Sequence, residues 1–332
     1  MLRSVRLSIA VQRWELLFVA IVALLVTAAM LWIAWQASQL VALDPACFAA
    51  DRDAPRCRDV VEQFGVLSGR GGQLLSYTGV IPFGVGLVVG VPLVSREIEH
   101  GTADLAWTLS PSRVRWLVPR MLTIATVLTA LLAILAIASE VVASAILPDL
   151  DLAADFTWYG QRGALLVMRG LLALAVGIVV GAAIGRQLPA LLLAVAATVA
   201  LFLVMNLAMD QWLRSDAIAA RFAFPDQGVS FIGSRSLGGF FQLPSGAILT
   251  SDELAARGVD MNNLVWEDDR GEFYASAADR AARRNLIGWH VDLLVPGAKY
   301  PVVVAKESLL LAIVALTAGG LSLAVVDRRR PY

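Results

Sequence analysis

Long apolar runs constrain the fold of this chain more than any other feature of its sequence. Each run has about 20 residues with few charges, the length that an α-helix needs to cross the hydrocarbon core of a bilayer. Only helices and closed barrels satisfy their backbone hydrogen bonds in lipid, so we expect helices here. The runs are Leu16–Trp35, Ser76–Val94, Leu117–Ser139, Gly163–Ile184, Leu188–Met209 and Val302–Val326. The sequence therefore predicts an all-α membrane protein with six transmembrane helices.

Composition supports the membrane class. Of the 332 residues, 58% are hydrophobic and only 16% are charged, which lies outside the range of soluble globular proteins. The formal net charge is zero, so the overall balance favours neither nucleic acid nor an acidic partner.

The distribution of arginines predicts the orientation of the helices. Clusters of arginine flank the apolar runs on one side of the membrane, and such clusters mark the cytosolic side. They are Arg3, Arg6 and Arg13, then Arg96, Arg113, Arg115 and Arg120, then Arg186, and finally Arg328–Arg330. Both termini are then cytoplasmic, with a basic tail over residues 327–332. Residues 1–15 are typical of an amphipathic helix on the membrane surface, the alternative being a disordered basic tail.

Two polar segments are predicted to lie outside the cell, residues 36–75 and the larger segment 210–301, whose fold the sequence does not indicate. Cys47 and Cys57 lie close together in the first of them. In an oxidising compartment this spacing favours a disulfide. A redox or metal pair is the alternative, but no histidine or further cysteine is near, so we expect no metal site.

Some residues within the predicted spans invite a functional interpretation beside a structural one. The glycines of Ser76–Val94 favour close helix packing over a ligand site. Arg169 and Glu140 are ionisable residues within or near spans, where charge is costly. They are candidates for a translocation path, with Arg169 near Glu140. The alternative for Arg169 is a side chain that extends to the outer membrane surface.

The polar segment between the second and third spans, residues 95–117, has a regular residue spacing that is not expected of an unstructured loop. Glu97, Ile98, Leu105 and Trp107 recur at roughly helical spacing, and Pro111 ends the run. We expect a short helix on the cytoplasmic membrane surface, followed by a turn and by Arg113 at the start of the next span.

Motifs for catalysis are absent from the sequence. It has no GxxxxGK[ST] phosphate loop, no HExxH and no GxSxG, and its two histidines lie far apart. We therefore expect no enzymatic activity in this chain and no bound cofactor.

The stretch REIEHGTADLAWTLSPSRVRW resembles the segment between the second and third spans of ABC-2 type permeases, the membrane subunits of ATP-binding-cassette transporters. Family members have an acidic pair, Gly-Thr, a short apolar stretch, a turn and an arginine before the next span. The matching residues here are Glu97, Glu99, Gly101, Thr102, Leu105, Leu109, Ser112 and Arg113. The sequence GVPLVSREIEHGT is most similar to that of permeases common in actinobacteria. The six-span layout with a large outer segment agrees with the family.

The resemblance implies an exporter in the bacterial plasma membrane that moves an amphipathic or lipid-like substrate. A separate ABC ATPase would bind ATP and Mg²⁺, and a second permease chain would complete a dimer, identical or related. Contact with the ATPase is implied for Arg96, Glu97, Glu99, His100, Gly101, Thr102, Leu105 and Arg113, with a solvated loop face as the alternative for the acids. A non-transporting ABC complex that senses or acts on an outer partner is the second functional hypothesis.

Overall fold

The computed structural model describes residues 10, 12–48, 55–103, 107, 112–221, 233–243, 245–249, 253, 256 and 289–329. Its chain divides into two units. The first comprises residues 1–152, 158–206 and 301–332, and the second comprises residues 153–157 and 207–300. The predicted surface helix over residues 1–15 lies largely outside the described residues.

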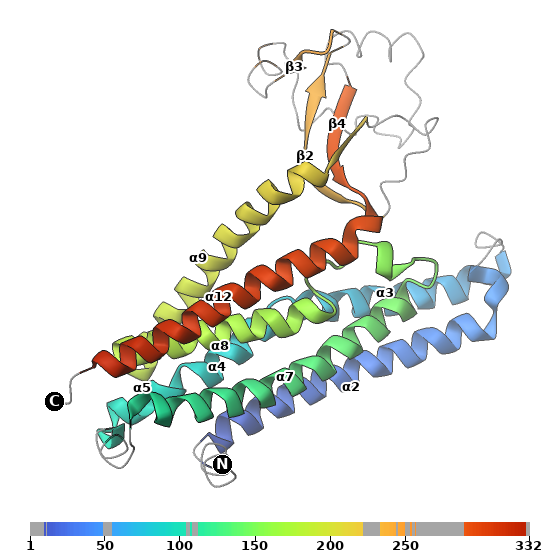
Figure 1. Ribbon diagram of the computed structural model, residues 1–332. Coiled ribbons are helices and arrows are strands. Elements are labelled where there is room, and N and C mark those ends of the chain that lie inside the picture. Colours follow the sequence, from blue (N-terminus) through green and yellow to red (C-terminus); the bar gives the residue numbers. More distant parts are fainter. Residues whose placement is uncertain are drawn as a thin grey trace. The chain divides into compact units, whose positions relative to one another are not determined.

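The first unit is a bundle of helices, and six helical segments of the described chain are long and apolar enough to span a membrane (Figure 1). The prediction of a helical membrane protein with six spans is confirmed, although the second unit adds a sheet that an all-α fold does not include. The helices of the bundle are α2 (Arg13–Leu43), α3 (Arg58–Thr78), α4 (Ile81–Gly90), α5 (Pro92–Glu99), α7 (Arg113–Ile146), α8 (Ala164–Ile184), α9 (Gln187–Leu213) and α12 (Tyr300–Arg328).

The second span is built from three consecutive helices rather than one. α3 ends at Thr78, and Pro82 lies in the first turn of α4, where its missing N–H costs no intrahelical hydrogen bond. Pro92 begins α5 in the same way. The two prolines therefore segment the span without ending it, and the apolar residues of Pro55–Glu99 still form one crossing.

The polar segment 36–75 differs from the loop that the sequence analysis expected. α2 continues to Leu43, and α3 occupies most of the remaining residues. α2 has 31 residues, or about 46 Å at ~1.5 Å per residue, which exceeds the ~30 Å hydrocarbon core. α3 is amphipathic, with Gly71, Leu75 and Thr78 buried, so hydropathy alone does not reveal it.

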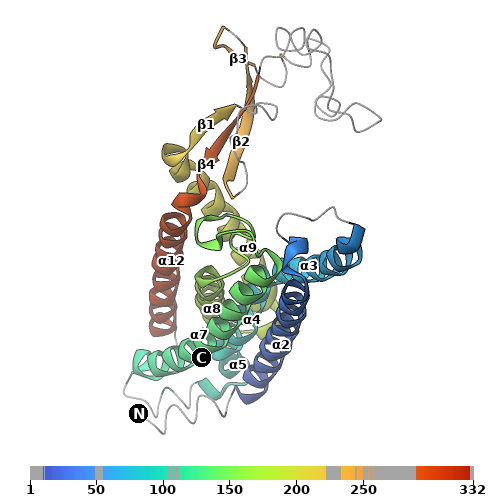
Figure 2. The ribbon, with the colours of Figure 1, turned by 90° about the vertical axis from the view of Figure 1, so that its right-hand side faces the viewer.

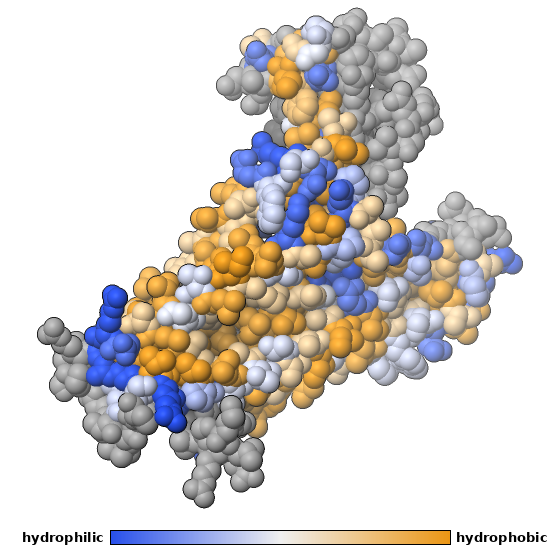
Figure 3. Space-filling model, in the orientation of Figure 1, coloured by the Kyte–Doolittle hydropathy of each residue, from blue (hydrophilic) through white to orange (hydrophobic). Residues whose placement is uncertain are grey.

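α4 packs closely against α8 in the bundle. A Cβ at Gly90 would lie 2.6 Å from the Leu174 carbonyl oxygen, and one at Gly86 would lie 2.8 Å from the Ala173 Cβ. A Cβ at Gly181 would be equally close to the Val91 carbonyl oxygen. Small residues on both helices thus allow backbone-to-backbone contact, which confirms the packing interpretation of these glycines. On the visible face, apolar side chains cover the sides of the helices (Figure 3).

The second unit contains a four-stranded antiparallel sheet in the segment whose fold the sequence did not indicate. The strands are β1 (Ile218–Arg221), β2 (Arg235–Gln242), β3 (Ile248–Leu249) and β4 (Trp289–Val295). Their order is β1-β4-β2-β3, so β4 lies between β1 and β2 (Figure 2). The short segment 153–157 belongs to this unit, where Phe156 packs edge-on against Tyr300 and its N–H donates to the Gly233 carbonyl at 3.0 Å.

Candidate functional site

One end of the bundle gathers the described residues of the segment 95–117. α2, α7 and α9 begin there, and α5, α8 and α12 end there (Figure 1). We call it the arginine-rich end, after Arg13, Arg96, Arg113, Arg115, Arg120, Arg186, Arg328 and Arg329. Figure 3 shows hydrophilic side chains collected around the end of α12. The segment 95–117 therefore lies beside the ends of several spans.

A glycine turn ends α5 and presents the residues that follow it. Gly101 has φ +71, in the left-handed region, and its N–H donates to the Ile98 carbonyl at 3.1 Å. This is a common glycine ending of a helix, because a Cβ is strained in that conformation. His100, Gly101 and Thr102 are exposed, and the Thr102 hydroxyl donates to the Glu97 carbonyl at 3.2 Å. α5 therefore ends at Glu99, so the helical spacing expected from Glu97 to Trp107 is interrupted at Gly101. Leu105 lies outside the described residues.

The charged residues of α5 contact neighbouring spans of the same chain. Arg96 donates to Glu15, in the first turn of α2, at 2.9 Å. Glu97 forms an ion pair with Arg120 of α7, and both side chains are about seven-eighths buried, with 13% and 12% exposed. The guanidinium of Arg120 also lies 4.3 Å from the ring centroid of Trp116. α5 is thereby joined to both α2 and α7.

Glu99 holds the start of α9. Its carboxylate accepts a hydrogen bond from the backbone N–H of Gln187, the first residue of that helix, at 2.9 Å. A helix N-terminus has unpaired N–H groups and a partial positive charge, so an anion there is favourable. Glu97 and Glu99, expected to meet a partner's basic groups, thus both have contacts within this chain.

Arg113 connects the start of α7 to the end of α12. Its guanidinium donates to the backbone carbonyls of Asp327, at 3.3 Å, and of Arg329. A cation at a helix C-terminus offsets the negative end of the helix dipole. The same guanidinium lies 4.7 Å from the ring centroid of Trp107, which packs edge-on against Trp116. The Arg329 side chain donates in turn to the Ala182 carbonyl near the end of α8.

Arg169 and Glu140, proposed together as a path, belong to different ion pairs. Arg169 of α8 pairs with Glu307 of α12 at 2.9 Å, and both side chains are 7% exposed. Glu140 pairs with Arg162 at 2.7 Å. Arg169 is therefore buried within the protein. Its ion-pair partner is Glu307, whereas the ion-pair partner of Glu140 is Arg162. The Arg169 guanidinium donates to the Gly160 carbonyl and to Glu307, so the side chain does not extend to the outer membrane surface.

Glu307 and Tyr159 are the residues that sequence reasoning missed. The Tyr159 hydroxyl donates to the Glu307 carboxylate that also receives Arg169. Glu307 lies inside the predicted span Val302–Val326 and should have drawn attention, because a buried arginine requires a compensating acid. Tyr159 gives no such signal, since it lies in the loop before α8.

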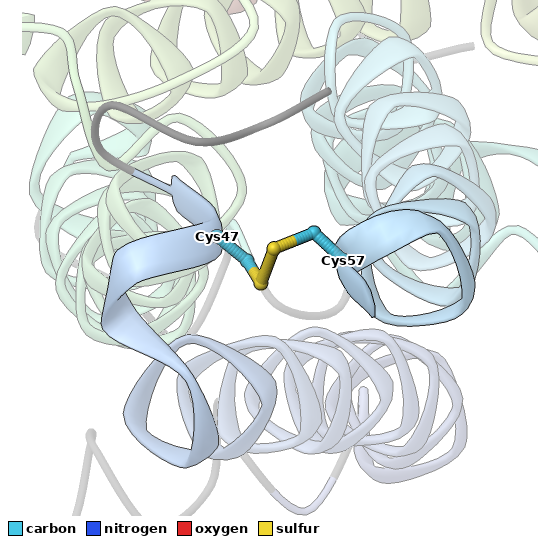
Figure 4. Close-up of a disulfide and its surroundings, with 2 residues drawn as sticks. All are labelled: Cys47 and Cys57. Carbon is cyan, nitrogen blue, oxygen red and sulfur yellow. A yellow bond between two sulfur atoms is a disulfide. The ribbon is translucent and has the colours of Figure 1, made fainter. Parts of the chain in front are cut away.

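Cys47 and Cys57 form a disulfide, as expected. Figure 4 shows their side chains meeting between the turn that follows α2 and the turn that precedes α3. Phe48 and Phe64 pack edge-on nearby, with ring centroids 4.9 Å apart. Asp44 is close to both sulfur atoms, but a disulfide leaves neither sulfur as the thiolate that a metal requires. The bridge is thus a structural link between α2 and α3.

Comparison with known proteins gives a family and no individual relative. Residues 18–214 match the model of a family described as ABC-2 membrane transporter related. The match covers most of α2 and all of α3 to α9, and it includes the segment 95–117. No curated protein and no solved structure matches the chain.

Proposed function

The chain belongs to the ABC-2 membrane transporter related family, and we propose that it is the permease through which an ABC transporter exports an amphipathic or lipid-like substrate. It is a multi-pass membrane subunit that works with an ABC ATPase subunit. In the proposal, ATP and Mg²⁺ bind to that ATPase, and this chain performs no hydrolysis itself. A second permease chain, identical or related, completes the transporter in the bacterial plasma membrane.

Two independent features support a cytosolic position for the arginine-rich end. Arginine clusters mark the cytosolic side of membrane proteins, and the helix ends gathered there have more of them than the opposite end. The disulfide between Cys47 and Cys57 joins the far ends of α2 and α3, and disulfides persist on the oxidising side of a membrane. Both features support the proposal that the termini are cytoplasmic.

The exposed turn His100–Thr102 is the proposed point of contact with the ATPase. Directly behind it, Arg96, Glu97 and Glu99 contact α2, α7 and α9. A small displacement of the turn would therefore move several spans at once through these contacts, as expected of an element that transmits a rigid-body movement. This set of contacts is the observation that carries the proposal.

ATPase measurements on the purified complex test the coupling role. We expect ATP hydrolysis to fall when Glu97 and Glu99 are replaced by alanine, while the ATPase still co-purifies, because the turn remains but its links to α7 and α9 are lost. Glu62→Ala, in α3 near the opposite end, is the matched control and should leave hydrolysis unchanged. Hydrolysis equal to that of the unaltered complex in the double variant contradicts the proposal.

A non-transporting ABC complex is the second candidate function. The folded sheet of the second unit favours it, since a structured segment suits recognition of an outer protein or peptide better than a bare linker. That function predicts ATPase activity that responds to an outer protein and no substrate movement in proteoliposomes. Substrate accumulation in inverted vesicles would support the exporter instead.

A further inference from the structure

α12 and α9 are the spans with the smallest share of residues buried by the rest of the described chain. Only 22% of the most apolar window of α12 is buried, against 67% for α8. Its buried residues form two groups, one with Tyr300, Val303, Glu307 and Leu311, and one with Ser322 and Val326. Within the described chain, no residue from 312 to 321 is buried. α12 is therefore most deeply buried near its two ends, while its middle is only partly buried.

A buried ionic cluster holds the first of these two ends. Glu307 accepts hydrogen bonds from the Tyr159 hydroxyl and from Arg169, which is fixed by the Gly160 carbonyl and lies 4.9 Å from the ring centroid of Phe202. An apolar cluster lies beside it, in which Leu165 and Leu172 of α8 pack with Leu311 of α12, joined by the partly buried Val304, Leu310 and Val314 of α12. Polar contacts therefore add to apolar packing in the attachment of α12 at this end.

The loop before α8 is shaped to form this cluster. Trp158, Gly160 and Gly163 all have positive φ, at 58, 73 and 70. Such backbone conformations are costly for residues with side chains and persist where surrounding contacts impose them. A Cβ at Gly160 would collide with the Arg169 guanidinium. The loop therefore brings the Tyr159 hydroxyl and the Gly160 carbonyl onto the pair between α8 and α12.

Energetics argue against a purely stabilising role for the pair. Removing two charges from water costs several kcal/mol per ion, and a well-packed apolar pair is often as stable or more stable. Each polar contact is directional, so a modest rotation or shift of α12 breaks the set at once. A lightly packed helix held in this way suits two discrete positions better than one.

We propose that Tyr159, Arg169 and Glu307 form a latch that holds α12 against α8 in the resting state and opens during the ATP-driven cycle. The inference rests on the proposed function, because it assigns α12 as a moving span of the transporter. Tyr159, Arg169 and Glu307 are positioning residues in this scheme. At the other end of α12, the contact of Arg113 with its last carbonyls provides the route by which the segment 95–117 reaches it.

Distances between spin labels test the latch. Labels are attached at Ala164→Cys on α8 and Leu309→Cys on α12, both exposed positions, while the native cysteines stay in their disulfide. In the otherwise unaltered chain we expect one short distance population. Glu307→Gln should add a longer population, and Tyr159→Phe should add a smaller amount of it. ATP with vanadate, applied to the complex with its ATPase, should shift the otherwise unaltered chain to the same longer distance.

Glu140→Gln is the matched control, because it makes the same change in a neighbouring ion pair that does not involve α12. It should leave the distances unchanged. If Glu307→Gln and Tyr159→Phe both leave the short population intact, or if nucleotide leaves it intact in a complex that hydrolyses ATP, the latch is refuted and the proposed function stands. If no ATPase binds the chain, the proposed function fails, whereas an effect of Glu307→Gln would still reveal the latch contact.

Discussion

Single residues carry the links between spans, and Glu97 is the clearest case. The Glu97–Arg120 pair is mostly buried, so removing the acid leaves a guanidinium without its partner. We expect Glu97→Gln to cost about 1–3 kcal/mol of stability, between the values for exposed and buried pairs. Thermal unfolding in detergent measures it. Arg120→Gln should cost a similar amount, and a double variant should cost less than the sum. Additive losses would mean that the two side chains do not interact.

Gly160 is a second residue whose identity the structure requires. Its φ of +73 disfavours any Cβ, and a Cβ there would also displace the Arg169 guanidinium. Gly160→Ala should therefore destabilise the protein by about 2–4 kcal/mol, from backbone strain and a disturbed buried ion pair. Gly65→Ala is the control, since nothing lies within 4 Å of a Cβ at that helical position of α3. There we expect a gain of ~0.5–1 kcal/mol. Equal effects at both positions would contradict the packing described.

Among the elements, the contact of α4 with α8 depends on glycine. A side chain at Gly90 would strike the backbone of α8 at Leu174. We expect Gly90→Leu to abolish the monodisperse peak in size-exclusion chromatography, because the two helices cannot both keep their positions. Gly84→Leu, on the same helix with nothing within 4 Å of its Cβ, should elute normally. A normal profile for Gly90→Leu would mean that α4 and α8 are not in backbone contact.

The disulfide is the covalent link between α2 and α3. It closes a short loop, with a sequence separation of 10, and such loops contribute about 2–3 kcal/mol. Cys47→Ser with Cys57→Ser should lower the midpoint of thermal unfolding, and a reducing agent should lower it similarly in the unaltered protein but not in the variant. A midpoint insensitive to both treatments would show that the bridge adds no stability.

The elements also show what sequence reasoning can and cannot reach. Hydropathy located all six spans, because burial in lipid requires long apolar runs. It missed α3, whose polar face leaves its average hydropathy low. It also missed the pairing of Arg169 with Glu307, since partners far apart in sequence are chosen by helix packing. Gly101 was predictable, because a turn of that kind after a helix strongly favours glycine.

At the scale of the whole molecule, we propose that a polar turn at the arginine-rich end receives movement from a separate ATPase and passes it to several spans. The strongest support is the set of ion pairs and hydrogen bonds that joins α5 to α2, α7 and α9. The family to which the chain belongs implies that an ABC ATPase subunit is its partner.

Site-specific cross-linking tests this account most directly. A cysteine-reactive cross-linker is placed at Thr102→Cys, in the exposed turn, or at Val302→Cys, which is exposed on the first turn of α12 at the opposite end. In membranes that also contain the ATPase, position 102 should yield a covalent product with it, and position 302 should yield none. A product from position 302, or none from position 102 while the two proteins co-purify, would contradict the account.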